Sequence, residues 1–391
     1  MQSASLANQV KDFRPAPRHG LRLDPLLLLA TLGLMVCGVV AVGRATNDDI
    51  PGDPRHFVYR QIAYGIVGFL LMLLMSRFDY SRIREWKVGL YALLIGGILM
   101  VLALGGATRG SKRWIEFPFF RFQPSELGKI LLILALAGFL VDRIRRLNER
   151  ETTSRIMLLA VIPSMLVVIQ PDIGTGMVYI VVALAVLFVA GTKWTHFVAL
   201  GTLMVTAIVV VLVAAPAVGV QVLKPYQVDR LTAFLNPTDN PRQEGYQISQ
   251  SLAAVGAGGK TGRGNQATQT KLDFLPEHHT DFIFSVVGEV FGFVGAALVL
   301  SLFALLIWRS LRILTMAKNL YGALIAGGIT AMLMFQVFLN VGMTIGIMPI
   351  TGVPLPLMSY GGSSVIVTFL ALGLLQSIHA QARETAAAKA F

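Results

Sequence analysis

The sequence carries little charge and a single cysteine. Only 14% of its 391 residues are Asp, Glu, Lys or Arg, whereas a soluble domain usually carries about 25%. The one cysteine, Cys37, lies inside an apolar run, which excludes a disulfide framework and a cysteine metal site. A hydrophobic content of 55% and a mean hydropathy of +0.68 indicate a polytopic membrane protein. The net charge of +12 does not indicate nucleic-acid binding, because a basic excess in a membrane protein is usually topological.

Ten apolar runs are candidates to cross a bilayer, which takes about 20 residues. Because the backbone must satisfy its own hydrogen bonds in lipid, we expect each run to be a helix. The predicted fold is therefore an all-α polytopic membrane protein with ten transmembrane helices and a long extracytoplasmic loop between spans 7 and 8. The runs fall near residues 23–43, 59–76, 88–106, 122–141, 156–170, 174–191, 197–215, 282–308, 319–340 and 356–378.

The loops predict the orientation of the chain. Lys and Arg are more frequent in the segments that are cytoplasmic when the N-terminus is placed inside. Both termini are then cytoplasmic, and the chain lies in the cytoplasmic (inner) membrane. We expect residues 1–391 to form a single integral-membrane domain, with a cytoplasmic tail at 1–22 and a large extracytoplasmic loop at 216–280. Within that loop, residues 246–255 are expected to form a short amphipathic helix at the membrane surface.

Ionisable residues inside the apolar runs gather toward the outer leaflet, whereas the cytoplasmic half looks apolar. Such residues cost about 3 kcal/mol each on insertion scales, so they are candidates for function. The Pro- and Gly-rich loop 348–364 lies on the same side. We expect these groups to converge on one outer cavity centred on Asp281, which opens span 8 directly after the large loop. The ionisable residues are Arg60, Glu126, Lys129, Asp172, Asp281 and Glu289.

Several of these residues have a structural alternative. Glu126 and Lys129 are three positions apart and can pair on one helix face, so they form either an ion pair that aids packing or part of a binding site. Asp281 stands at a helix start, where the helix dipole favours a capping carboxylate, and capping would not exclude catalysis. Glu289 is expected to make interhelical hydrogen bonds rather than to take part in chemistry.

The short outer loop 107–121 breaks the charge pattern. It holds several cations against the single acid Glu116. This excess on the outer side indicates an anionic ligand, with contact to lipid headgroups as the alternative. The cations are Arg109, Lys112, Arg113 and Arg121.

The cytoplasmic loops limit the possible chemistry. All of them are too short to hold a nucleotide-binding domain, and the glycine-rich stretch 256–264 does not match the Walker spacing. An outward-facing enzyme then needs a substrate that carries its own activation, and a lipid diphosphate-sugar meets that need. Basic side chains would hold the diphosphate, with a divalent cation (Mg or Mn) as an optional cofactor and no nucleotide. His278 and His279 lack a third ligand, so no protein metal site of the zinc type is expected.

Seven short motifs follow one another along the chain. They are 113–115 (RWI), 123–126 (QPSE), 170–175 (QPDIGT), 230–237 (RLTAFLNP), 246–251 (YQISQS), 276–284 (PEHHTDFIF) and 354–364 (PLPLMSYGGSS). Together they resemble the SEDS (shape, elongation, division and sporulation) family of peptidoglycan glycosyltransferases, and the resemblance covers nearly the whole chain. The short N-terminal extension and residues 349–354 favour the elongation branch, RodA, over the division branch, FtsW. One departure is that Val-Phe-Gly follows Glu289 where many members have a second acid.

The resemblance implies a ten-span enzyme that polymerises lipid II into glycan strands at the outer membrane face during cell elongation. It implies that Asp281 matches the family's essential aspartate, and that Trp114, Glu126, Lys129 and Asp172 match positions in or near its cavity. It also implies a partner, a class B penicillin-binding protein that supplies the transpeptidase. Other membrane proteins of the elongation complex (the elongasome) are expected beside it.

We therefore predict an inverting glycosyltransferase in which Asp281 is the general base. Arg109, Arg113 and Lys129 would hold the donor diphosphate, and Glu126 would position Lys129. The alternative is a lipid II flippase, which should show a polar path through both leaflets and often two related halves; a pure scaffold for the partner is a third hypothesis. The remaining candidate substrate contacts are Trp114, Asp172, Ser359 and Ser363.

Overall fold

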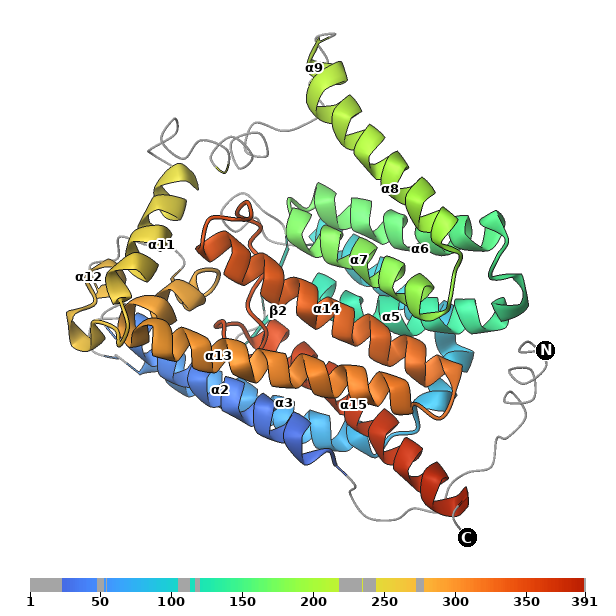
Figure 1. Ribbon diagram of the computed structural model, residues 1–391, viewed down its shortest axis with the longest axis horizontal. Coiled ribbons are helices and arrows are strands. Elements are labelled where there is room, and N and C mark those ends of the chain that lie inside the picture. Colours follow the sequence, from blue (N-terminus) through green and yellow to red (C-terminus); the bar gives the residue numbers. More distant parts are fainter. Residues whose placement is uncertain are drawn as a thin grey trace.

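The computed structural model describes residues 23–47, 53, 55–104, 113–116, 120–217, 234, 244–271 and 278–389. This part is largely helical (Figure 1), which confirms the predicted all-α membrane class. Within it, nine helices are long and apolar enough to cross a membrane, and Ile173–Val189 is a shorter apolar helix. Each of these helices overlaps a predicted run, but the run predicted at 356–378 begins before α15, which starts at Gly362, and α13 and α15 continue to Met316 and Lys389, past the predicted ends at 308 and 378. The number of crossings stays a prediction. They are α2 (Pro25–Ala45), α3 (His56–Ser76), α4 (Lys87–Leu104), α5 (Pro124–Asp142), α6 (Arg150–Ile169), α7 (Ile173–Val189), α8 (Trp194–Val209), α13 (Ile283–Met316), α14 (Leu320–Thr344) and α15 (Gly362–Lys389).

Short elements connect the long helices. The short elements are η1 (Tyr80–Trp86), the antiparallel pair β1 (Ile115–Glu116) and β2 (Arg121–Phe122), η2 (Ile144–Arg146), η3 (Val210–Ala214), α9 (Ala215–Ala217), α11 (Glu244–Gly258), η4 (Gly264–Gln266) and α12 (Thr268–Lys271).

The helix predicted at 246–255 is present as α11. Its position on the membrane surface stays a prediction. The predicted tail 1–22 lies outside the described residues, as do 218–233, 235–243 and 272–277 of the large loop.

The starts of α2 and α14 are capped by polar side chains. Asp24 accepts a hydrogen bond from the Leu27 amide at 2.9 Å, and Pro25 follows it at the start of α2. Asn319 accepts one from the Gly322 amide at 2.8 Å at the start of α14. Such caps satisfy amides that a helix start leaves without an intrahelical partner. They fix the boundaries that apolar runs alone define only loosely.

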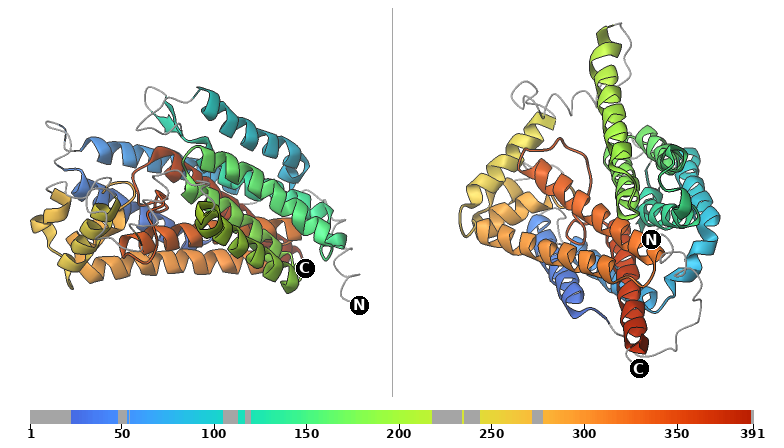
Figure 2. Two further views of the ribbon diagram at one scale, coloured as in Figure 1. Left: turned by 90° about the horizontal axis from the view of Figure 1, so that it is seen from above. Right: turned by 45° about the vertical axis from the view of Figure 1, so that its right-hand side comes forward.

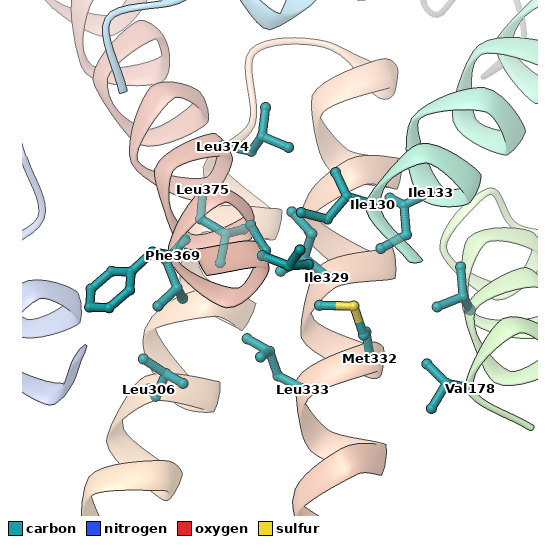
Figure 3. Close-up of a cluster of buried hydrophobic side chains, with 14 of the residues drawn as sticks. Ile130, Ile133, Val178, Leu306, Ile329, Met332, Leu333, Phe369, Leu374 and Leu375 are labelled. Carbon is teal, nitrogen blue, oxygen red and sulfur yellow. The ribbon is translucent and has the colours of Figure 1, made fainter. Parts of the chain in front are cut away.

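The centre of the bundle is formed by α5, α14 and α15. Most of each of these helices is buried, whereas no residue of α8 is buried, and α8 extends away from the other helices in Figures 1 and 2. Lipid tails are as apolar as the side chains, so the hydrophobic effect does not drive helices together in a bilayer. Close side-chain packing holds them together instead. Figure 3 shows this packing for Ile130, Ile133, Val178, Leu306, Ile329, Met332, Leu333, Phe369, Leu374 and Leu375.

Helix α13 is interrupted at Gly292, and the glycine-rich stretch 256–264 packs against the interruption. Gly292 has φ 62° and ψ −158°, which are not helical values. The Phe293 amide therefore donates outside the helix, to the Gly259 carbonyl oxygen at 2.9 Å. The stretch 256–264, which superficially resembles a phosphate loop, thus accepts a hydrogen bond from a backbone amide that α13 leaves without a partner inside the helix.

The expectation of an apolar cytoplasmic half is wrong at the end of the bundle opposite Asp281. Asp24 is fully buried and is paired with Arg309, which lies near the end of α13. Gln376 of α15 accepts a hydrogen bond from the Asp24 amide at 2.7 Å, and His379 Nδ1 lies 3.7 Å from the Asp24 carboxylate. The sequence pattern placed Arg309 in a loop, but a buried carboxylate needs a counter-charge. This pair ties α2 to α13 and α15.

Candidate functional site

The segment between α14 and α15 folds back into the interior of the bundle as a re-entrant loop. Most residues from 350 to 359 are buried. Leu357 has φ +65°, a value that bulky residues seldom adopt. Its carbonyl oxygen lies 2.7 Å from the position that a Cβ would occupy on Gly38 of α2. Irregular backbone at this depth needs a cover of protein, and backbone strain of this kind clusters at functional sites.

Asp281 lies in the turn that leads into α13, and it is partly exposed. Its Oδ2 lies 3.5 Å from the position that a Cβ would occupy on Gly352. The carboxylate therefore faces the re-entrant loop. Phe282 occupies the N-cap position of α13, so Asp281 stands one residue before the cap.

The turn that carries Asp172 approaches the same part of the loop. A Cβ on Gly174, at the start of α7, would lie 2.3 Å from a Val353 methyl carbon. Gly174, two residues after Asp172, and the Asp281 carboxylate therefore both lie against residues 351–353. The structure brings the Asp281 carboxylate and the turn that carries Asp172 to one short piece of backbone.

Asp172 and Gln123 form a buried polar pair at the starts of α7 and α5. Asp172 accepts hydrogen bonds from the Thr175 amide and from Gln123 Nε2, both at 3.1 Å. The Gln123 main-chain amide donates to Ser363 Oγ at 3.0 Å, and Ser363 Oγ donates to the Arg121 carbonyl oxygen at 2.9 Å. In this structure Asp172 caps a helix, and Ser363 anchors α15 to β2.

Ser359 has a similar anchoring role. Its Oγ accepts a hydrogen bond from the Leu355 amide at 2.8 Å, and its carbonyl oxygen accepts one from Gln61 Nε2 of α3 at 3.2 Å. Ser359 and Ser363 are both buried. The two serines hold the re-entrant loop, and their contact with substrate stays a prediction.

Glu126 and Lys129 form a buried ion pair in the first turns of α5. Lys129 Nζ lies 2.6 Å from Glu126 Oε1, and the side chains are 2% and 4% exposed. Tyr179 of α7 donates to the Ser125 carbonyl oxygen at 3.0 Å and packs α7 against this turn. The predicted pairing is confirmed. Contact between Lys129 and a diphosphate stays a prediction, because the amine is enclosed in this arrangement.

The cationic loop 107–121 is described only in part, and Arg109 lies outside the described residues. Arg113 donates through Nε to the carbonyl oxygen of residue 170 at 3.0 Å and through Nη2 to that of residue 171. These bonds use two of the five N–H donors of a guanidinium. Arg113 thus sits against the α6–α7 turn, with half-buried Trp114 beside it in sequence.

Glu289 is fully buried and binds α12. Its Oε2 accepts hydrogen bonds from the amide and the hydroxyl of Thr270 at 3.0 and 2.6 Å, and its Oε1 accepts one from the Gln269 amide at 2.9 Å. The expectation that it makes interhelical hydrogen bonds is confirmed.

Aromatic rings join three segments at the Asp281 end of the bundle. The ring of Phe57 in α3 lies 5.1 Å from that of His279 and 5.0 Å from that of Tyr360, between centroids. The Tyr360 amide donates to the His279 carbonyl oxygen at 2.9 Å. These contacts hold the Asp281 turn against α3 and against the end of the re-entrant loop.

An apolar groove of about 380 Å³ lies between α2, α3 and α15. Met35, Gly65 and Phe369 are among its lining residues. An entirely apolar lining suits a hydrocarbon chain. Helix α3, which forms one wall, carries Phe57 of the aromatic group in its first turn.

Sequence reasoning missed three amides that hold the site together. Gln61, Gln123 and Asn340 are buried and bond the re-entrant loop, the Asp172 turn and the Asp281 turn. A polar side chain in or beside an apolar run is the signal that identifies such positions.

Comparisons with known proteins agree over most of the chain. Residues 23–384 match a family described as cell cycle protein, covering FtsW, RodA and SpoVE. Peptidoglycan glycosyltransferase MrdB of Escherichia coli K12 is 38% identical over 360 residues, which are 91% of this chain and 93% of that protein. A solved structure concerned with the coordination of polymerization and crosslinking by a peptidoglycan synthase complex matches with a TM-score of 0.78 and 32% identity, covering 93% of this chain and 99% of that one. A crystal structure of the rod shape determining protein RodA of Thermus thermophilus matches with a TM-score of 0.65 and 28% identity, over 92% and 98% of the two chains.

Proposed function

The chain belongs to the FtsW, RodA and SpoVE family of cell cycle proteins, and on this premise we propose that it polymerises lipid II during cell elongation. It is a peptidoglycan glycosyltransferase, as the curated relative is named. The elongation role is supported by the likeness to a rod shape determining protein. The chain acts in the cytoplasmic membrane, with both termini in the cytoplasm and the Asp281 end of the bundle facing outward.

The position of Asp281 carries the proposed mechanism. Its carboxylate faces a strained, buried loop that the Asp172 turn also contacts. Asp281 takes the proton from the 4-hydroxyl of the acceptor sugar, and the hydroxyl oxygen attacks C1 of the donor sugar. The bond between C1 and the diphosphate oxygen breaks, and the lipid diphosphate leaves with the electron pair. A positioned base of this kind contributes about 10²–10⁴-fold in rate, and one displacement inverts C1.

Cations near the Asp172 turn would steady the leaving diphosphate. Arg113 is held beside that turn by two of the five N–H donors of its guanidinium, counted over the part of the chain that the structure describes, and Arg109 belongs to the same loop. Lys129 would join them only if its pair with Glu126 opened. The apolar groove between α2, α3 and α15 would take part of the lipid tail.

A divalent cation would need the substrate's own oxygens as ligands. Within the described residues, no group of three His, Cys, Asp or Glu side chains could hold a metal ion. Mg²⁺ is often bound through one or two carboxylates together with substrate phosphates. A Mg or Mn ion carried on the diphosphate fits the residues present, and it would offset negative charge on the leaving group.

A class B penicillin-binding protein is the proposed partner, with other membrane proteins of the elongation complex around them. A neighbour in structure belongs to a peptidoglycan synthase complex that couples polymerization with crosslinking. The exposed apolar faces of α13 and α14, which include Phe293 and Phe338, offer surface to a partner's membrane span.

The flippase alternative has less support. The charges buried at the end opposite Asp281 are paired with one another, as Asp24 is with Arg309. Such a closed pair ties helices together and offers no polar path to a headgroup.

Reconstitution into liposomes with the partner tests the proposed function. Lipid II is added, glycan strands are resolved by electrophoresis, and lipid II movement between leaflets is followed in parallel. We expect strands from the wild-type chain and from Asp53→Asn, which removes an exposed carboxylate beside α3. Movement of lipid II with no strands formed would overturn the proposal in favour of the flippase.

A further inference from the structure

Asn340 joins the Asp281 turn to the re-entrant loop. It lies inside α14 and is fully buried. Its Nδ2 donates hydrogen bonds to the carbonyl oxygen of Asp281 at 2.8 Å and to that of Val353 at 2.9 Å. A side-chain amide nitrogen has two N–H donors, so both are used on two segments far apart in sequence.

The two carbonyl groups belong to the two segments that meet at the Asp281 carboxylate. Val353 follows Gly352, which has φ +70°. A Cβ on Gly352 would lie 3.5 Å from Asp281 Oδ2. Asn340 therefore fixes both the residue that carries the carboxylate and the backbone that the carboxylate faces. Val353 also packs on Gly174 of α7. By bonding the Val353 carbonyl, the Asn340 amide therefore helps to hold the loop against α7, the helix that Asp172 caps.

The chemistry of the side chain matches this use of its donors. Asn340 Oδ1 is buried and has no hydrogen-bond partner within the described part of the chain. Most buried polar atoms do have a partner. Among the described residues, the amide therefore acts through its two N–H groups. An aspartate of the same shape would turn acceptors toward two carbonyl oxygens, and a leucine would leave both carbonyls without this donor.

We propose that Asn340 is a positioning residue for glycosyl transfer. It holds the Asp281 turn against residues 352–353, so that the carboxylate stands where the acceptor hydroxyl arrives. This inference rests on the proposed role of Asp281 as the general base. A base must lie within hydrogen-bond reach of the proton that it takes, and a displacement of about 1 Å can cost about 10²-fold in rate.

The test uses the full chain with its partner in liposomes, with kcat and KM measured for lipid II. We expect Asn340→Leu to lower kcat by about 10²-fold and to leave KM nearly unchanged. Asn340→Gln, which keeps both donors on a longer stem, should recover part of kcat. Gln336→Leu is the matched control, because it removes another buried amide from α14 one turn earlier. A wild-type kcat in a folded Asn340→Leu protein would overturn the proposal.

Two further variants, Asn340→Asp and Asp281→Asn, separate the possible outcomes. If Asn340→Leu does not fold, the near-isosteric Asn340→Asp carries the test, and a wild-type kcat in that variant would also overturn the proposal. Asp281→Asn is measured beside them. If Asp281→Asn keeps full activity, the general-base proposal fails. If Asp281→Asn is inactive while Asn340→Leu and Asn340→Asp work normally, only the positioning role of Asn340 fails. Equal falls in kcat for Asn340→Leu and Gln336→Leu would assign the loss to helix packing and would likewise overturn it.

Discussion

Replacing Lys129 by Met should strongly destabilise the protein, because it leaves Glu126 as a buried charge without its partner. The two groups are 2.6 Å apart, and their side chains are 2% and 4% exposed. Removing one member of such a pair costs about 3–5 kcal/mol, whereas replacing both members by apolar side chains of similar volume is often neutral or stabilising. We therefore expect Lys129→Met and Glu126→Met to lose stability singly, and the double variant to regain most of it.

The assay is equilibrium unfolding of the purified variants in detergent, with glycan synthesis measured on the same preparations. Lys193→Met, which removes an exposed lysine at the start of α8, should stay within about 0.5 kcal/mol of the wild type. If Lys129 holds the donor diphosphate, the stable double variant stays inactive. A Lys129→Met protein as stable as the wild type would refute the reasoning, since a buried unpaired carboxylate would then have no measurable cost.

Three other substitutions have expected outcomes. Asp172→Ala removes a helix cap and should cost about 1–2 kcal/mol of stability, measured by the same unfolding transition. Gly352→Ala forces a side chain into a left-handed conformation at φ +70°, which should cost about 1–2 kcal/mol and should lower the polymerisation rate, because the new methyl group faces Asp281. Arg309→Met leaves Asp24 buried without its partner and should cost about 3–5 kcal/mol; glycan synthesis per folded molecule should stay normal because the pair lies at the far end of the bundle.

The helices were predictable from the sequence because length and hydropathy decide whether a run can cross a bilayer. Each predicted run corresponds to a helix in the described chain. The buried pairing of Glu126 with Lys129 was also predictable, because helical spacing places the two groups on one face. Asp281 was singled out by its position between a polar loop and an apolar run, and the structure turns its carboxylate toward the re-entrant loop.

Contacts between distant segments could not be predicted in the same way. Nothing in the local pattern shows that residues near Leu357 reach Gly38 of α2, since that contact depends on how distant segments pack together. The pairing of Asp24 with Arg309 was missed because the two charges lie at the ends of separate runs. The role of Asn340 was missed because its partners are main-chain carbonyl groups. Every residue has such a group, so the sequence does not show which one a side chain bonds.

The most direct test of the general-base proposal is the kcat of Asp281→Asn at saturating lipid II, in liposomes that also contain the partner. Lipid II affinity and the unfolding transition are measured alongside, so that loss of binding or of folding is recognised. We expect kcat to fall by about 10²–10⁴-fold with affinity and stability near the wild type. Glycan synthesis at the wild-type rate would contradict the assignment of Asp281 as the general base.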